Sequence, residues 1–322
     1  MVISKNVIYN PAVFPIEREI VVEENERSTL DCTKFPRDID IIRSLPFPVQ
    51  LSPTSTVAKT FALMNNNNDV TELTIYKENL FYEFNLDDQT VRSIPAEIGQ
   101  LTLLRTLRIY DSPVLHLPNE FGNLKLLGTL IIKNSSLYDL PTAIENLSVL
   151  TTLDLSYNNL KTLPSTIASL RSLQTLDIQS NQLTSINELN NMNSLRYLYA
   201  QNCSITHLPK IMSQLIYLYM SYNHLQDLIG IGTLGTVSQM KDFDFGYNQI
   251  DFIAPEISRI IRYIQKLSVK HNRLTYLAKE IYDQPNAATT FLDISENLFT
   301  GDELNSIKAT IKIKLPAIKV TY

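Results

Sequence analysis

Cysteine is scarce in this sequence, which holds only Cys32 and Cys203 among its 322 residues. Two cysteines exclude a disulfide-rich secreted scaffold, and they favour a reducing, cytoplasmic compartment. Basic residues are not in excess either, because 28 Lys and Arg against 33 Asp and Glu leave a net charge of -5. Such a chain has no long-range field that attracts a phosphate backbone, so we expect no nucleic-acid partner.

Long apolar runs are also missing. The N-terminal segment MVISKNVIYNPAVFP has no apolar stretch of signal-peptide length, and no run of about 18 apolar residues occurs anywhere, so we expect no membrane span. A secreted protein whose signal sequence has been removed stays open as the alternative. The chain does have 44% hydrophobic and 19% charged residues, which is enough to fold around a continuous core.

One segment of the sequence recurs along most of the chain. The residues LTTLDLSYNNL, from Leu150 to Leu160, return as LQTLDIQSNQL from Leu173 to Leu183. Further copies begin at Leu195, Leu215, Met240, Ile264 and Thr289, and weaker ones at Val70, Leu104 and Leu127. The ninth template position recurs every 20 to 25 residues between Ser112 and Asn297, a period that excludes 34-residue helical repeats.

The second half of each unit is regular as well. LPSTIASLRSL, from Leu163 to Leu173, matches LPTAIENLSVL, LPNEFGNLKLL and IPAEIGQLTLL in the three units before it. The apolar cores of the strands lie at Leu107 to Ile109, Leu130 to Ile132, Leu153 to Leu155 and Leu176 to Ile178. This combined spacing resembles the leucine-rich repeats of Ras-suppressor-like and many bacterial and archaeal proteins, over roughly residues 70 to 300.

The resemblance implies an α/β solenoid, a curved leucine-rich-repeat horseshoe with a parallel concave sheet and an irregular or short helical convex side. Template positions four and six of each strand then point into the core, and positions three, five and seven point to the concave surface. Because no unit buries its leucines alone, the stack needs closed ends. We expect a cap or small appended element over residues 1–69, a solenoid of about ten repeats over 70–300 and a helix-strand cap over 301–322.

The two caps carry local predictions of their own. In residues 1–69, IEREIVV and RSTLDC flank EENE and predict a hairpin, while TVAKTFALM predicts a short helix around Val57 to Met64 that covers the first repeat. At the other end, a helix over Asp302 to Thr310 precedes an alternating strand pattern from Lys312 to Tyr322. This second cap is expected to shield the edge of the last repeat.

An asparagine ladder occupies the ninth template position. Its members, with one cysteine in the same column, are Asn158, Asn181, Cys203, Asn223, Asn248, Asn272 and Asn297. A side-chain amide here can satisfy main-chain groups where the chain turns off the strand, so we interpret the ladder as structural. Cys203 is interpreted as a small buried thiol rather than as a reactive nucleophile.

Tyrosine is the least generic feature of the outward positions. The candidate binding residues of this type are Tyr197, Tyr199, Tyr217, Tyr219, Tyr222 and Tyr247, with Tyr157 nearby. Adjacent strands bring Tyr197 beside Tyr217 and Tyr199 beside Tyr219, about 4.8 Å apart. Tyrosine is frequent in binding hot spots because its ring buries a large rigid area while its hydroxyl still finds a polar partner. Packing of the tyrosines on one another alone is the alternative.

Aspartates flank these tyrosines, at Asp154, Asp177, Asp242 and Asp244. The position-five aspartates, which include Asp293, form a stripe rather than an acid/base pair, and a solvated acidic face is the structural alternative. We predict that the concave face binds a protein or peptide that carries basic and apolar groups together. A secreted or cell-surface module that recognises a host protein or a glycan is the alternative function.

No catalytic or metal-binding constellation emerges from the sequence. Residues Gly230 to Gly235 satisfy the pattern G-x-G-x-x-G, but they lie inside a repeat without a surrounding βαβ unit, so we interpret the glycines as turn residues on the convex side. The four histidines fall in different repeats without metal-ligand spacing, at His116, His207, His224 and His271. We therefore predict a non-catalytic interaction scaffold that uses no cofactor and no metal.

Overall fold

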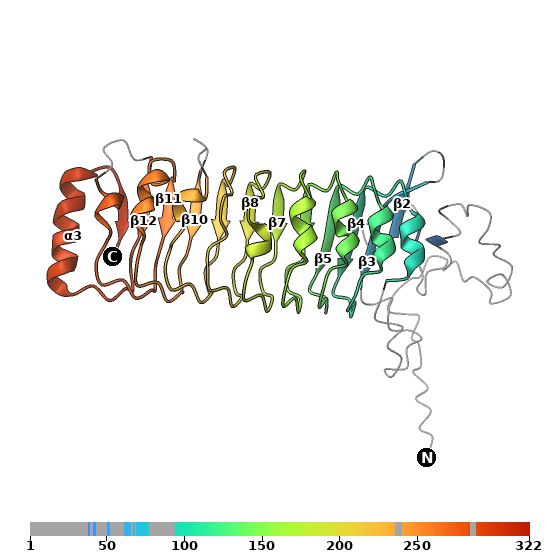
Figure 1. The fold of residues 1–322 in the computed structure, drawn as a ribbon, viewed down its shortest axis with the longest axis horizontal. Coiled ribbons are helices and arrows are strands. Elements are labelled where there is room, and N and C mark those ends of the chain that lie inside the picture. Colours follow the sequence, from blue (N-terminus) through green and yellow to red (C-terminus); the bar gives the residue numbers. More distant parts are fainter. Residues whose placement is uncertain are drawn as a thin grey trace, which may run out of the picture.

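The fold is that of a computed structural model, which describes residues 94–235, 240–283 and 288–322 throughout. Before residue 94 it describes residues 38, 41–42, 50–51, 61–65, 67 and 69–76. Within these residues, one open 13-stranded sheet contains the strands in chain order (Figure 1). The strands are β1 (Gln50–Leu51), β2 (Phe61–Met64), β3 (Val70–Tyr76), β4 (Thr106–Tyr110), β5 (Thr129–Lys133), β6 (Thr152–Asp154), β7 (Thr175–Asp177), β8 (Tyr197–Tyr199), β9 (Tyr217–Tyr219), β10 (Asp242–Asp244), β11 (Lys266–Ser268), β12 (Phe291–Asp293) and β13 (Lys319–Thr321).

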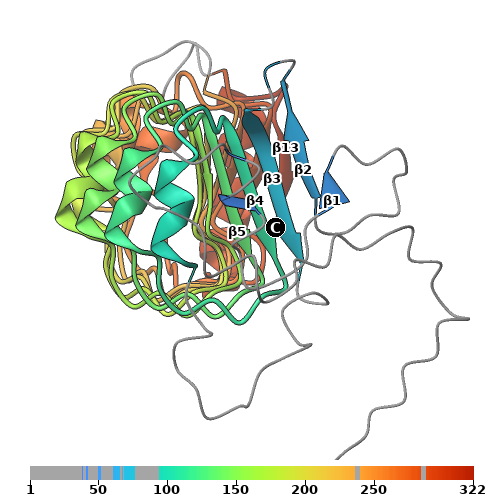
Figure 2. The same ribbon diagram turned by 90° about the vertical axis from the view of Figure 1, so that its right-hand side faces the viewer.

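Short 3-10 helices lie on the convex side of the solenoid, opposite the sheet, as the view along its length shows (Figure 2). They are η3 (Ala96–Gln100), η4 (Asn119–Asn123), η5 (Thr142–Asn146), η6 (Ser165–Ser169), η7 (Asn187–Leu189), η8 (Ile231–Thr233), η9 (Pro255–Arg259) and η10 (Lys279–Ile281). The α-helix α3 (Gly301–Lys314) precedes the last strand. The curved, open α/β solenoid predicted from the repeats is thus confirmed.

The strands from β3 to β13 are parallel, and each repeat pairs with the next in matching register. Leu153 of β6 pairs with Leu176 of β7, and Leu198 of β8 pairs with Leu218 of β9. All four of these leucines are fully buried, because successive side chains of a strand alternate and the leucines stack into one column. The residues on either side of each leucine therefore share the concave face.

The convex segments follow from the second half of the repeat. Pro164 has φ -68° and stands directly before η6, and Ile167 and Leu170 of the same segment are fully buried. Proline favours this position because its fixed φ suits the first turn of a helix, where an N–H is not needed. The unit between β8 and β9 differs, because its convex segment contains no 3-10 helix.

The ladder asparagines lie where the chain leaves each strand, and all are buried except Asn297, which is partly buried. Nδ2 of Asn158 donates to the main-chain oxygens of Ile132 and Leu155 at 2.6 and 2.9 Å, and its Oδ1 accepts from the N–H of Leu137 at 3.1 Å. The same contacts recur at Asn181, Asn223, Asn248, Asn272 and Asn297. Each amide thus bonds its own repeat to the repeat before it.

Cys203 occupies the ladder position of its repeat, where its thiol offers fewer hydrogen-bonding groups than an asparagine amide. Its Sγ lies 3.4 Å from the main-chain oxygen of Ile178, and the residue is 9% exposed. Burial raises the pKa of the thiol to about 11. A thiol with that pKa is protonated at neutral pH, which suits a packed side chain and not a nucleophile.

The helix predicted around Val57 to Met64 is wrong for the residues that the structure describes. Phe61–Met64 forms β2, which pairs antiparallel with β3. Ala62 of β2 and Val70 of β3 are fully buried. A strand satisfies the main-chain groups at the edge of β3, which a helix cannot do. The hairpin predicted from IEREIVV and RSTLDC lies outside the described residues.

The C-terminal cap contains a longer helix than the sequence predicts. The side chain of Thr300 accepts from the N–H of Glu303 at the start of α3, and Ile307 and Ile311 are buried. Residues 312–314, predicted as strand, continue this helix, and the N–H of Leu315 donates to the oxygen of Ile311. The strand β13 begins later and pairs with β12 in parallel, so it extends the sheet past the last repeat.

Candidate partner-binding face

Four tyrosines form a stacked group on the concave face of β8 and β9, which we call the tyrosine platform: Tyr197, Tyr199, Tyr217 and Tyr219. The ring centroids of Tyr197 and Tyr217 lie 5.6 Å apart at an interplanar angle of 19°. Those of Tyr199 and Tyr219 lie 5.5 Å apart at 27°. The in-register pairing of β8 with β9 causes this stacking, because each tyrosine faces its counterpart one strand away. All four rings remain partly exposed.

Aspartates border the tyrosine platform on both sides. On one side, β7 places Asp177 beside Tyr199, with Asp154 one strand further away on β6. On the other side, β10 places Asp242 beside Tyr217 and Asp244 beside Tyr219. The hydroxyl of Tyr219 donates diagonally to Oδ2 of Asp242 at 3.2 Å. The predicted residues of these five strands are therefore brought together.

The electrostatics of this region are unfavourable for added negative charge. Burial raises the pKa of the Asp177 carboxyl, and the charge of Asp154 raises it further. Burial also raises the pKa of Asp242, although the hydroxyl of Tyr219 opposes the change. The phenol pKa values of Tyr199 and Tyr219 rise through burial and through the neighbouring aspartate charges. A cation that reached this face would offset these costs.

The position-five aspartates also have a structural role, which the sequence reasoning missed. Oδ1 of Asp154 accepts from the N–H of Ser156 at 2.9 Å, and Oδ1 of Asp244 accepts from the N–H of Gly246 at 2.9 Å. The same contact occurs at Asp177 and Asp293. The signal in the sequence was the recurrence of aspartate two residues before the strand turns away, a position from which its side chain can bond the main chain.

Tyr222 and Tyr247 do not belong to the tyrosine platform. With His271 they occupy template position eight and form a separate row, the rim stack, at the edge where the strands end. Their φ angles are 57°, 54° and 51°, so the backbone turns there, past the ends of β9, β10 and β11. The centroids of Tyr222 and Tyr247 lie 4.3 Å apart, and those of Tyr247 and His271 lie 4.7 Å apart. Tyr157 has the same template position after β6, with φ 58°.

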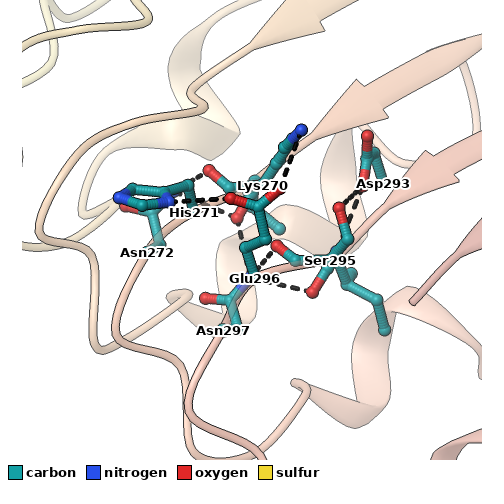
Figure 3. Close-up of polar contacts among 9 residues, drawn as sticks. Lys270, His271, Asn272, Asp293, Ser295, Glu296 and Asn297 are labelled. Atoms are coloured by element: carbon teal, nitrogen blue, oxygen red, sulfur yellow. Dashed lines mark hydrogen bonds and ion pairs between the residues drawn. The ribbon is translucent and has the colours of Figure 1, made fainter.

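Charged side chains meet beside His271, where Figure 3 shows Lys270 and His271 both directed at the carboxylate of Glu296. Nδ1 of His271 lies 2.9 Å from Oε2 of Glu296, and Nζ of Lys270 lies 2.9 Å from Oε1 of the same carboxylate. Both contacts lower the pKa of Glu296. Nζ of Lys270 also lies 5.6 Å from the ring centroid of Tyr247. The rim stack thus has its own internal charge compensation.

The remaining motifs do not form a site among the described residues. Gly230 and Gly235 have φ of 91° and 106° on either side of η8, so the glycine motif forms convex turns. His116 lies 2.8 Å from Asp139 and His207 lies 2.8 Å from Thr206, far apart along the solenoid. Nowhere in the described ranges do three metal-ligating side chains meet. No helix in the same ranges is long and apolar enough to cross a bilayer.

A hollow of about 450 Å³ lies at the opposite rim, where β6, β7 and β8 begin. Thr151, Gln174 and Arg196, which each precede one of these strands, line it together with Arg171. It contains none of the platform tyrosines. The candidate site is therefore the sheet face itself rather than a pocket.

Comparisons with known proteins agree with this architecture. Residues 122–227 match the family model described as a leucine-rich repeat region. A comparison with curated protein sequences finds no match. Among solved structures, the chain resembles an internalin from Listeria monocytogenes with 25% identity, over 71% of this chain and 70% of that one, at a TM-score of 0.53.

Two further solved structures have a similar fold. The leucine-rich-repeat ectodomain of the plant receptor kinase GASSHO1/SCHENGEN3 from Arabidopsis thaliana, in complex with Casparian strip integrity factor 2, has 22% identity, covers 76% of this chain and 37% of that one, and has a TM-score of 0.55. A complex of TLR13 with ssRNA13 has 21% identity, covers 63% and 30%, and has a TM-score of 0.54. The likeness to Ras-suppressor-like repeats and the exclusion of nucleic acid stay predictions.

Proposed function

We propose that this chain, a leucine-rich-repeat protein, holds a protein or peptide on its concave face without catalysing a reaction. The observation that carries the proposal is the tyrosine platform, in which four stacked rings lie partly exposed on a sheet face rather than in the core. Aromatic side chains on such a face have no core to fill, and surfaces of this kind mark interaction sites.

The flanking charges indicate which partner the face favours. Asp177, Asp242 and their neighbours border the rings, and burial raises the pKa of both carboxyls. A partner with basic groups would pair with these carboxylates, while its apolar groups would cover the rings. We therefore favour a basic and apolar protein segment over an acidic one.

Selection from a random peptide library displayed on phage tests the proposal. The wild-type protein should enrich peptides that the Tyr199→Ala/Tyr219→Ala variant binds at least about 100-fold more weakly, because each tyrosine anchor contributes about 2 kcal/mol. The matched control is Tyr138→Ala/Tyr276→Ala, which removes two tyrosines that lie outside the strands and are each 45% exposed. Thermal unfolding of all three proteins shows whether a loss of binding reflects a loss of fold.

Two results would contradict the proposal. In the first, the platform variant keeps its affinity for the enriched peptides. In the second, the control variant loses affinity as much as the platform variant does.

A further inference from the structure

The tyrosine platform and its aspartates have a defined order along the solenoid. From β6 to β10 the concave face presents aspartate, aspartate, tyrosine, tyrosine and aspartate at template position five. At template position three, Asp242 adds a second carboxylate beside the rings on β10. The face is therefore acidic at two ends and aromatic in the middle.

The two acidic ends lie a fixed distance apart. Adjacent strands are about 4.8 Å apart, so β7 and β10 are separated by about 14 Å and β6 and β10 by about 19 Å. An extended peptide rises about 3.3 Å per residue. Two side chains that reach the two acidic ends at once are therefore about four to six residues apart in such a peptide.

The sheet itself limits how a peptide can bind here. Strands β6 to β10 each have a hydrogen-bonded neighbour on both sides. Their main-chain groups are already paired, so a peptide cannot join the sheet as an extra strand at this place. Recognition must come from side chains, and a peptide that crosses the strands contacts both acidic ends as well as the rings.

The rings and carboxylates together favour an arginine side chain as the cation of the partner. Oδ1 of Asp177 and of Asp244 accepts from the main chain, Oδ2 of Asp177 accepts from Nε2 of Gln179 at 2.8 Å, and Oδ2 of Asp242 accepts from Tyr219. Nζ of Lys266 lies 4.0 Å from Oδ2 of Asp242, so this carboxylate already has one basic neighbour. Arginine suits such a place because its planar group bonds a carboxylate and stacks on an aromatic ring together.

We propose that the partner is an extended peptide segment that crosses β6 to β10, with two basic side chains about four to six residues apart and apolar residues between them. The basic side chains, preferably arginines, bond the aspartates on either side of the tyrosine platform. The apolar residues between them cover the four rings. This inference rests on the proposed function and names the chemistry and spacing of the partner.

The test is a series of fluorescein-labelled peptides of about fourteen residues, built from serine, proline and leucine, with two arginines about two, four, six or ten positions apart. Fluorescence polarisation should give the tightest binding at the middle two spacings and at least about tenfold weaker binding at the outer two. Replacing both arginines by glutamine should weaken binding by at least about tenfold as well.

The protein side of the test uses a matched pair of variants. Asp244→Asn removes a charge beside the tyrosine platform, and Asp293→Asn removes one from the same template position on β12. Asparagine keeps the oxygen that accepts from the main chain in both places. Asp244→Asn should weaken binding of the best peptide about fivefold or more, and Asp293→Asn should leave it unchanged.

The inference and the proposed function fail in different ways. If affinity does not depend on arginine spacing, or if the glutamine peptides bind as well, the inference is wrong, even where Tyr199→Ala/Tyr219→Ala still abolishes peptide selection. If no peptide of the series binds, the inference is wrong too. A single-stranded oligonucleotide that binds the wild type and not this tyrosine variant would overturn it in favour of another class of partner.

Discussion

The asparagine ladder allows a stability prediction in which the structure supplies both the change and its control. Asn158→Ala removes an amide that is 6% exposed. Its Nδ2 donates to Ile132 and Leu155 at 2.6 and 2.9 Å, and its Oδ1 accepts from Leu137 at 3.1 Å. After the substitution, the carbonyl of Ile132 and the N–H of Leu137 lose this partner in a buried place, while the carbonyl of Leu155 keeps its bond from Asn181.

The magnitude follows from these three bonds. Each contributes about 1 kcal/mol net, so Asn158→Ala should lower the free energy of unfolding by about 3 kcal/mol. For a folded region of about 150–250 residues this corresponds to a fall in Tm of about 6–12 °C. Circular dichroism during heating, together with urea titration, measures both quantities.

Asn159→Ala is the control, one residue further along the chain. Its amide makes only long contacts, 3.5 Å to the oxygen of Ser136 and 3.4 Å from Nε2 of Gln182. We expect a change within about 0.5 kcal/mol. If Asn158→Ala costs less than about 1 kcal/mol, or no more than Asn159→Ala, the ladder bonds do not stabilise the fold as argued.

Two further predictions concern stability. Cys203→Asn should complete the ladder and raise the free energy of unfolding by about 1 kcal/mol, and a lower urea midpoint would show that the site cannot accept the larger side chain. Ile211, a β-branched residue at φ 56° and 50% exposed, lies in a left-handed conformation that costs about 1–2 kcal/mol. Ile211→Gly should therefore raise the free energy of unfolding by about 1 kcal/mol. The control is Ile229→Gly, at a similarly exposed residue without positive φ, which should lower the free energy of unfolding. Equal effects of the two substitutions would contradict the strain argument.

Most of the solenoid could be predicted because its physics is periodic. The spacing of Leu153, Leu176 and Leu198 alone defines a buried column and, with it, the outward face of each strand. The ends are not periodic, and there local pattern was insufficient. A short apolar segment such as Phe61–Met64 suits a helix or a strand, and pairing with β3 decides between them.

The C-terminal cap illustrates the same limit. The alternation of lysine and isoleucine over Lys312 to Lys314 is typical of a strand. Ile313 is nevertheless 80% exposed, so the alternating pattern does not mark a buried face of a strand. Ile307 and Ile311, by contrast, are four residues apart and buried on one side of α3. Burial against the last repeat, which the local sequence does not contain, decides the helical state.

The candidate site could be predicted in part, for a related reason. Strand pairing in register is enough to bring Tyr197 to Tyr217, so the tyrosine platform follows from the template. The separation of Tyr222 and Tyr247 from it depends on positive φ angles at position eight, which the residue type does not indicate for tyrosine. Where a strand ends therefore determines which tyrosines share a surface.

The tyrosine platform lies at the shortest repeat among those that the structure describes throughout. The unit from Cys203 to Asn223 spans 20 residues, against 23 from Asn158 to Asn181, and its convex segment has no 3-10 helix. In a solenoid the rotation from one repeat to the next sets the curvature, and a thinner convex side reduces the convergence of side chains on the concave side. The ring centroids of the two stacked pairs lie 5.6 and 5.5 Å apart, so neighbouring rings stand side by side on adjacent strands. The shortened repeat therefore gives four large side chains room to stand side by side with their faces partly open.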